Sequence, residues 1–164
     1  MANARVSKDN YYLDIAQTVS ERSTCLRRRF GAIIVKNDVI VSTGYNGAPR
    51  GRANCNELHS CYRETLGIPR GERYELCRSV HAEANAIIAA PRDQMLGASL
   101  YLCCTSPENN AVMPGTSSCM MCKKLVINAG IARVIVRDDA ENYRVINVSD
   151  WIDDDDSLGG RLGY

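Results

Sequence analysis

The chain has 164 residues, with 20 Lys and Arg against 19 Asp and Glu and a formal net charge of +1. This length suits a single domain with a substantial hydrophobic core, and the near-neutral charge argues against a nucleic-acid-binding surface. No apolar run approaches the length of a membrane span, and residues 1–8 lack the apolar region of a signal peptide, so we expect a cytoplasmic protein. In that compartment, the eight cysteines favour metal and thiol chemistry over disulfides.

The first part of the chain predicts one helix and two strands. Apolar residues recur with helical spacing over residues 9–23, where Asp9 is the expected N-cap. Two runs rich in β-branched residues, 31–35 and 39–43, predict strands that are joined by a tight turn at Asn37-Asp38. The following residues, up to about position 78, show no periodicity and are rich in Gly, Pro, Asn and Cys, which indicates irregular structure.

The second part predicts two helices and three strands. One helix is expected over residues 81–90 and another over 118–129, with Gly130 as the C-cap of the second. The order of elements predicts an α/β fold in which helices cover both faces of a mixed central β-sheet. We expect this domain to span residues 1–152 and to be followed by an acidic, then Gly-rich tail over 153–164. The predicted strands of this part are 100–103, 134–136 and 144–148.

Two short motifs supply ligands for a metal ion. His81-Ala82-Glu83 is followed downstream by Cys119-Met120-Met121-Cys122. With His81, Cys119 and Cys122 as ligands, the fourth position of a tetrahedral zinc stays open for water, which is typical of a catalytic site. Glu83 is not needed as a ligand and is close enough in sequence to handle the proton of that water. An H-x-E motif followed by C-x-x-C is the signature of zinc nucleobase deaminases.

Other interpretations of these motifs exist. A C-x-x-C pair alone also fits a redox pair or half of a zinc ribbon, and a lone histidine is more often structural. The chain has only two histidines, which excludes a His-rich site. A thioredoxin-like pair would directly follow an early strand, whereas Cys119 follows a loop late in the chain. These observations favour catalytic zinc.

Both motifs are expected at helix N-termini. There, exposed backbone N–H groups and the positive end of the helix dipole favour the thiolate forms of Cys119 and Cys122. Zinc lowers the pKa of its bound water, and we expect zinc-bound hydroxide to attack the amino-bearing carbon of a cytosine-type ring. In this scheme Glu83 takes the water proton, delivers it to the ring nitrogen and then protonates the departing amine.

Longer segments resemble the deoxycytidylate (dCMP) deaminases of the cytidine deaminase superfamily. The resemblance runs from about Tyr11 to Trp151 and is carried by Glu21-Arg22-Ser23-Thr24-Cys25, Thr43-Gly44-Tyr45-Asn46-Gly47-Ala48-Pro49, His81-Ala82-Glu83-Ala84-Asn85-Ala86-Ile87 and residues 119–130. It implies a cytidine deaminase-like sandwich and hydrolysis of dCMP to dUMP and ammonia, which supplies dUMP for thymidylate synthesis. It also implies zinc on His81, Cys119 and Cys122, a proton shuttle at Glu83, and Asn46 on the substrate sugar. Members are homo-oligomers, commonly hexamers, and are often regulated by dCTP and dTTP.

Alternative functions remain open at this point. In one alternative, the chain is a deaminase of another base-bearing molecule, such as cytidine, deoxycytidine or a tRNA adenosine. In the other, it is a non-catalytic module in which the zinc only holds the fold. Low net charge counts against tRNA, and a purely structural zinc module would have no use for Glu83.

Two features depart from the family pattern near the metal motif. The family usually has Pro before the first cysteine, where this chain has Ser118, and we expect Ser118 to cap the helix by accepting a backbone N–H bond. Residues 107–117 form a longer connection than in many relatives and are expected to lie beside the metal, where they affect substrate specificity.

Four further cysteines are not explained by catalysis. Some members of the resembled family carry a second, structural zinc in this region, which would pin a long loop. His59 is an alternative ligand to one of the thiols. The competing interpretation is that these cysteines are small buried hydrophobic residues, as we expect for Cys103, while Cys104 is placed at the pocket. The candidate ligands of the second zinc are Cys25, Cys55, Cys61 and Cys77.

The sugar and the phosphate of a mononucleotide need partners as well. Asn46 suits the sugar, although Asn-Gly is also a common turn dipeptide and Gly44 is equally explained by crowding at a strand end. Two candidates for the phosphate contact are left open: Arg27-Arg28-Arg29, although a short charge run is usually a solvated face or a subunit contact, and Arg50, which is the better candidate because it directly follows the Asn46 loop.

Overall fold

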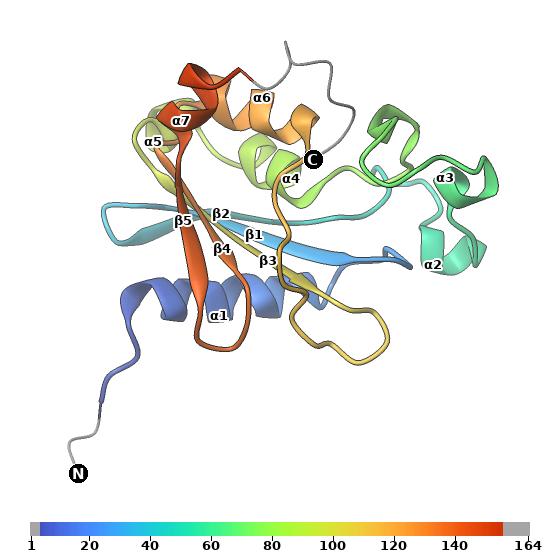
Figure 1. Ribbon diagram of the computed structural model, residues 1–164, viewed down its shortest axis with the longest axis horizontal. Coiled ribbons are helices and arrows are strands. Elements are labelled where there is room, and N and C mark those ends of the chain that lie inside the picture. Colours follow the sequence, from blue (N-terminus) through green and yellow to red (C-terminus); the bar gives the residue numbers. More distant parts are fainter. Residues whose placement is uncertain (1–3, 156–164) are drawn as a thin grey trace.

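The computed structural model describes residues 4–155 and has a five-stranded mixed sheet at its centre (Figure 1). The strand order is β2-β1-β3-β4-β5. Strand β3 pairs with β4 in parallel, and the other neighbouring pairs are antiparallel. The strands are β1 (Arg29–Lys36), β2 (Val39–Tyr45), β3 (Ser99–Thr105), β4 (Arg133–Arg137) and β5 (Tyr143–Asn147).

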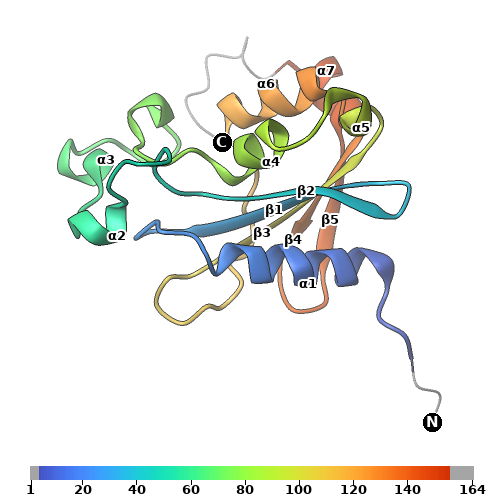
Figure 2. The same ribbon diagram turned by 180° about the vertical axis from the view of Figure 1, so that it is seen from behind.

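Helices cover both faces of this sheet, which confirms the predicted α/β sandwich. Helix α1 (Lys8–Ser20) lies on one face, and the other face carries α4 (Ala82–Ile88), α6 (Met120–Ala129) and α7 (Val148–Asp153) (Figures 1 and 2). None of the helices described over residues 4–155 is long and apolar enough to cross a membrane. The remaining short helices are α2 (Cys55–Leu58), α3 (Tyr62–Thr65), the 3₁₀ turn η1 (Tyr74–Leu76) and α5 (Arg92–Met95).

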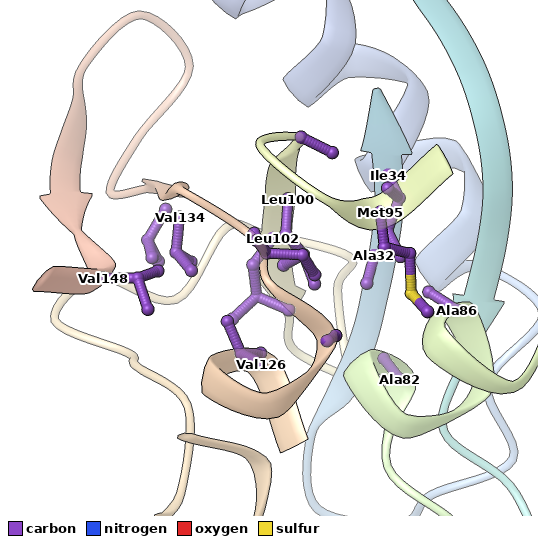
Figure 3. Close-up of a cluster of buried hydrophobic side chains, with 14 residues drawn as sticks. Ala32, Ile34, Ala82, Ala86, Met95, Leu100, Leu102, Val126, Val134 and Val148 are labelled. Atoms are coloured by element: carbon purple, nitrogen blue, oxygen red, sulfur yellow. The ribbon is translucent and has the colours of Figure 1, made fainter. Parts of the chain in front are cut away.

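The central strands are buried on both sides, and their residues alternate between two hydrophobic clusters. In β1, Ala32 and Ile34 pack with α4 and α6, whereas Ile33 and Val35 pack with α1. Figure 3 shows the first cluster, in which Leu100 and Leu102 of β3 lie between the sheet and these helices. This alternation follows from the two-residue period of a strand, and it explains why the sequence shows continuous apolar runs here.

Glycine lets α1 and α4 approach the sheet closely. A Cβ on Gly31 would lie 2.0 Å from the carbonyl oxygen of Ala16 in α1, and a Cβ on Gly44 would lie 2.3 Å from that of Ala82 in α4. Real Cβ atoms do not approach backbone so closely. Gly44 therefore does relieve crowding, and it sets the distance between β2 and the helix that carries Glu83.

Several predicted element ends differ in the structure. The N-cap of α1 is Ser7, whose hydroxyl accepts the backbone N–H of Asn10, so the assignment of Asp9 was wrong. Asp9 instead accepts a hydrogen bond of 2.7 Å from the hydroxyl of Tyr101. Strand β5 ends at Asn147, one residue before the predicted end, because Asn147 is the N-cap of α7, which begins at Val148. The greater part of the predicted tail, residues 156–164, lies outside the described residues.

Candidate active site and metal centre

His81 and Cys119 occupy equivalent places at the start of two neighbouring helices. His81 is the N-cap of α4 and Cys119 is the N-cap of α6, while Cys122 follows one turn into α6. The ligand atoms of these three residues all lie within 4.8 Å of one another. In the part of the chain that the structure describes, this is the one group of three or more His, Cys, Asp or Glu residues that meets this distance. Two motifs 38 residues apart thus converge because both helices lie on the same face of the sheet.

The spacing of the three ligands fits a tetrahedral zinc ion. The Sγ atoms of Cys119 and Cys122 each lie 3.4 Å from Nδ1 of His81. Zn–S bonds of about 2.3 Å and Zn–N bonds of about 2.0 Å at a tetrahedral angle would place sulfur and nitrogen about 3.5 Å apart. The donor set and its geometry therefore suit zinc, and they assign Nδ1 as the nitrogen that would bind it.

Glu83 lies beside this centre without joining it. It is on the first turn of α4, it is only 4% exposed, and it lines the same cavity as His81 and Cys119. Burial raises the pKa of its carboxyl, while the positive charge of His81 acts in the opposite direction. A carboxyl with a raised pKa can hold a proton and release it closer to neutral pH, which suits general acid-base catalysis.

The three ligand residues have very different pKa values. Hydrogen bonds from Cys122 and His81 outweigh burial and lower the pKa of Cys119 to about 4. The bond to this thiolate, together with burial, raises the pKa of Cys122. Burial would lower the pKa of His81, but hydrogen bonds with Cys119 and Cys77 raise it to about 11. Zinc must therefore displace protons from Cys122 and His81, so its affinity is expected to fall in acid.

A single cavity extends from the metal ligands toward the irregular part of the chain. The lining residues are of several kinds: the metal ligands His81 and Cys119 with Glu83, then Phe30 of β1 and Asn46, which directly follows β2, and a set of basic residues. The basic residues are Arg27, Arg28, Arg63 and Arg70. Among the residues of the 4–155 range that line the cavity, Glu83 is the one carboxylate.

Asn46 lines the cavity but is also tied to the protein. Its side-chain oxygen accepts hydrogen bonds from the hydroxyl of Ser23 and, at 2.8 Å, from the backbone N–H of Phe30. Its amide nitrogen donates to the carbonyl of Arg28 at 3.0 Å. One amide hydrogen is left for a sugar hydroxyl. Asn46 therefore holds the segment before β1 in place, a role that its sequence context did not indicate.

Several other residues that the sequence predicted for the site do not line the cavity or do not take the predicted role. Arg50 is exposed and does not line the cavity. The Ser118 hydroxyl is buried and has no hydrogen-bond partner among the described residues, and the N-cap is Cys119, so the predicted cap at Ser118 was wrong. From the 107–117 connection, Ser117 reaches the cavity. Cys104, expected at the pocket, is buried and is not among the lining residues.

The four upstream cysteines gather in the irregular region without forming a closed ligand set. Cys25, Cys61 and Cys77 line the cavity, and Cys55 is buried nearby. Burial raises the pKa of Cys55, and the charges of the other three cysteines raise it further, which places all four thiols within electrostatic reach. Burial would raise the pKa of the Cys77 thiol, but its interaction with the nearby His81 lowers the pKa below the ordinary value, so Cys77 is the member of this group that senses the metal centre.

Comparison with known proteins identifies the family of this chain. The family described as "Cytidine and deoxycytidylate deaminase zinc-binding region" matches residues 6–138. The chain belongs to this family. A deoxycytidylate deaminase of Mycobacterium phage D29 is 36% identical over 137 residues, which cover 80% of this chain and 95% of the phage protein.

Two further relatives extend the comparison. The deoxycytidylate deaminase of Schizosaccharomyces pombe is 33% identical over 80% of this chain, and the match spans only 37% of the yeast protein. The crystal structure of the dCMP deaminase from cyanophage S-TIM5 in complex with dCMP and dUMP aligns with a TM-score of 0.53 at 26% identity. That alignment covers 84% of this chain and 85% of the phage chain. The cytidine deaminase-like fold and the zinc-binding deaminase region are thereby confirmed.

Proposed function

We propose that this chain is a zinc-dependent deaminase that converts dCMP and water to dUMP and ammonia. The observation that carries the proposal is the metal centre: His81, Cys119 and Cys122 at zinc-compatible distances, with the buried Glu83 beside them. Relatives of similar length that are named deoxycytidylate deaminases support dCMP as the substrate. The product would supply thymidylate synthesis, and the predicted cytoplasmic location suits that role.

The residues of the chain divide the work as follows. His81, Cys119 and Cys122 would hold a zinc ion, which would act as a Lewis acid and make water a nucleophile near neutral pH. Glu83 would accept one proton of that water and transfer it to the ring nitrogen of the base; it would then take the second proton, from the hydroxyl added to the ring carbon, and deliver it to the amine, which leaves as ammonia when the C–N bond breaks and the carbonyl forms. Because Glu83 is only 4% exposed, bulk water does not compete for this proton. The segment that Asn46 fixes would position the sugar.

The decisive experiment measures ammonia release from dCMP, deoxycytidine, cytidine and a tRNA that carries a target adenosine. We expect kcat/KM for dCMP to exceed that for deoxycytidine by at least about a hundredfold, or roughly 3 kcal/mol of transition-state binding. Equal turnover of the two would favour a nucleoside deaminase, and turnover of tRNA alone would favour an adenosine deaminase. If the zinc-loaded protein turns over none of these substrates, the chain is a structural zinc module.

We also propose a second, structural zinc on Cys25, Cys55, Cys61 and Cys77. The proposal is supported by the placement of Cys25, Cys61 and Cys77 in the lining of one cavity with Cys55 within electrostatic reach, and by the short helices around them, which are too short to be stable alone. Metal analysis of zinc-replete protein should give two zinc ions per chain. The Cys55→Ala variant should hold one zinc ion and have a lower melting temperature. One zinc per wild-type chain would instead identify these cysteines as packing residues.

Assembly and regulation complete the proposal. We propose a homo-oligomer, a hexamer by family resemblance, that responds to dCTP and dTTP. Support comes from exposed apolar side chains on the helical face, among them Ile88 at 76%, Ile152 at 59% and Leu125 at 43% exposure. Light scattering at assay concentrations tests the assembly, and dCMP kinetics with and without each nucleotide test the regulation. A monomer whose kinetics ignore both nucleotides would contradict the proposal.

A further inference from the structure

A buried arginine stands in the wall of the cavity without a carboxylate partner. Arg63, on α3, is only 4% exposed and lines the cavity. Its Nε and Nη2 donate to the backbone carbonyls of Pro69 and Glu72, with the shortest bonds at 2.6 and 2.7 Å. Over residues 4–155, no carboxylate lies within ion-pair distance of its guanidinium, and Nη1 has no hydrogen-bond partner there. A buried charge in this condition is costly unless something balances it.

The surroundings hold this guanidinium firmly. Its carbon atom lies 4.3 Å from the ring centroid of Tyr74, a cation–π contact. The same ring meets His81 edge-on, with centroids 5.4 Å apart. Arg63, Tyr74 and His81 therefore form one continuous wall that runs from the metal ligands to the buried charge.

The other basic residues of the cavity are less suited to this role. Arg27 already pairs with Glu64 at 2.9 Å. Arg70 is exposed and Arg28 is half-buried, so both can add positive potential but neither needs a counter-ion as Arg63 does. Arg50, which the sequence suggested, lies outside the cavity.

We propose that Arg63 is the residue that reads the 5′-phosphate of the substrate, with Arg28 and Arg70 adding positive potential. The proposal rests on the proposed function and deepens it. A phosphate is dianionic near neutral pH and offers several acceptor oxygens, which matches a fixed guanidinium with donors to spare. The bonds to Pro69 and Glu72 set the orientation of the guanidinium in advance, so little freedom is lost when the phosphate binds.

The test compares kcat/KM for dCMP and deoxycytidine in the zinc-loaded full chain. Arg63→Met keeps most of the length of the side chain and removes its charge. We expect it to lower kcat/KM for dCMP at least about a hundredfold and to change that for deoxycytidine by less than about threefold. Arg63→Lys restores a point charge without the fork and should recover about tenfold of the loss. Arg52→Ala, an exposed arginine outside the cavity, is the matched control and should leave both values unchanged.

Each outcome of this experiment supports or refutes a stated part of the proposal. A wild-type ratio near one would refute the proposed function itself, because no phosphate would be read. A high wild-type ratio that persists in both Arg63 variants refutes the role of Arg63 alone, and its loss in Arg50→Ala instead would return the role to Arg50. Equal losses for both substrates would make Arg63 a structural residue. Should Arg63→Met fail to fold, Arg63→Lys carries the test through its selective loss of dCMP turnover.

Discussion

Gly44→Ala tests how the fold sets the position of the catalytic helix. The added Cβ would lie 2.3 Å from the carbonyl oxygen of Ala82 and 2.4 Å from the backbone nitrogen of Ala86, both in α4. Ordinary contacts begin near 3.4 Å, so about 1 Å of separation is missing. Both obstacles are backbone atoms and cannot rotate away. Helix α4 must therefore move outward from β2, or the strand must bend.

This displacement has two consequences of different size. Overpacking of this kind typically costs about 1–3 kcal/mol of unfolding free energy, and we expect a value near 3 because two backbone atoms are involved. Helix α4 also carries His81 at its start and Glu83 in its first turn. A misplacement of about 1 Å at reacting groups can cost about a hundredfold in rate, so we expect a loss of that order in kcat.

Gly31→Ala is the matched control. Its Cβ would lie 2.0 Å from the carbonyl oxygen of Ala16 in α1, on the opposite face of the sheet. Urea denaturation should therefore show similar destabilisation for both variants, while kcat at a temperature where both are folded should fall only for Gly44→Ala. Equal activity in the two variants, at equal zinc content, would refute the idea that the contact at Gly44 positions the catalytic helix.

Three further predictions concern the site and the core. Glu83→Gln should keep the zinc content of the wild type and lose at least about a hundredfold in turnover, whereas loss of metal would make Glu83 a ligand. Chelation at neutral pH should lower the melting temperature by roughly 5–10 °C, since about 2.7 kcal/mol is lost when zinc had been present at a hundred times its Kd; an unchanged melting temperature would exclude metal-linked stability. Asp14→Asn removes the carboxylate 2.7 Å from the buried Arg137 and should cost about 1 kcal/mol, because Asp14 is 59% exposed, with no change in kcat.

The regular elements could be predicted from the sequence because each follows a simple period. The strand at 31–35 is buried on both faces and reads as an apolar run, and the helix after His81 begins where its motif predicts. The irregular region after Asn46 could not be predicted. Its form depends on contacts such as the bond of 3.1 Å from the backbone of Ala48 to the side chain of Asn54 and the capping of carbonyls by Arg63. Such tertiary contacts leave no periodic pattern in a sequence.

The same distinction explains which site residues could be predicted. Metal chemistry admits few residue types, so His81, Cys119 and Cys122 stand out at their spacings, and the structure brings them together. Phosphate binding requires only a positive charge, and the chain has 20 Lys and Arg. Nearness in sequence to Asn46 favoured Arg50, but the chain turns away there, and burial rather than sequence distinguishes Arg63.

The two proposals about the irregular region depend on each other. Arg63 lies in the segment between Cys61 and Cys77, and the elements of that segment, α3 and η1, are too short to be stable alone. A zinc ion on the flanking cysteines would hold this segment against the sheet and so fix Arg63. Cys61→Ser should then lose one zinc ion and also lower kcat/KM for dCMP more than tenfold, while deoxycytidine turnover stays within about threefold. If zinc is lost without a change in the ratio of the two substrates, Arg63 is held by Pro69, Glu72 and Tyr74 alone, and the structural zinc serves only stability.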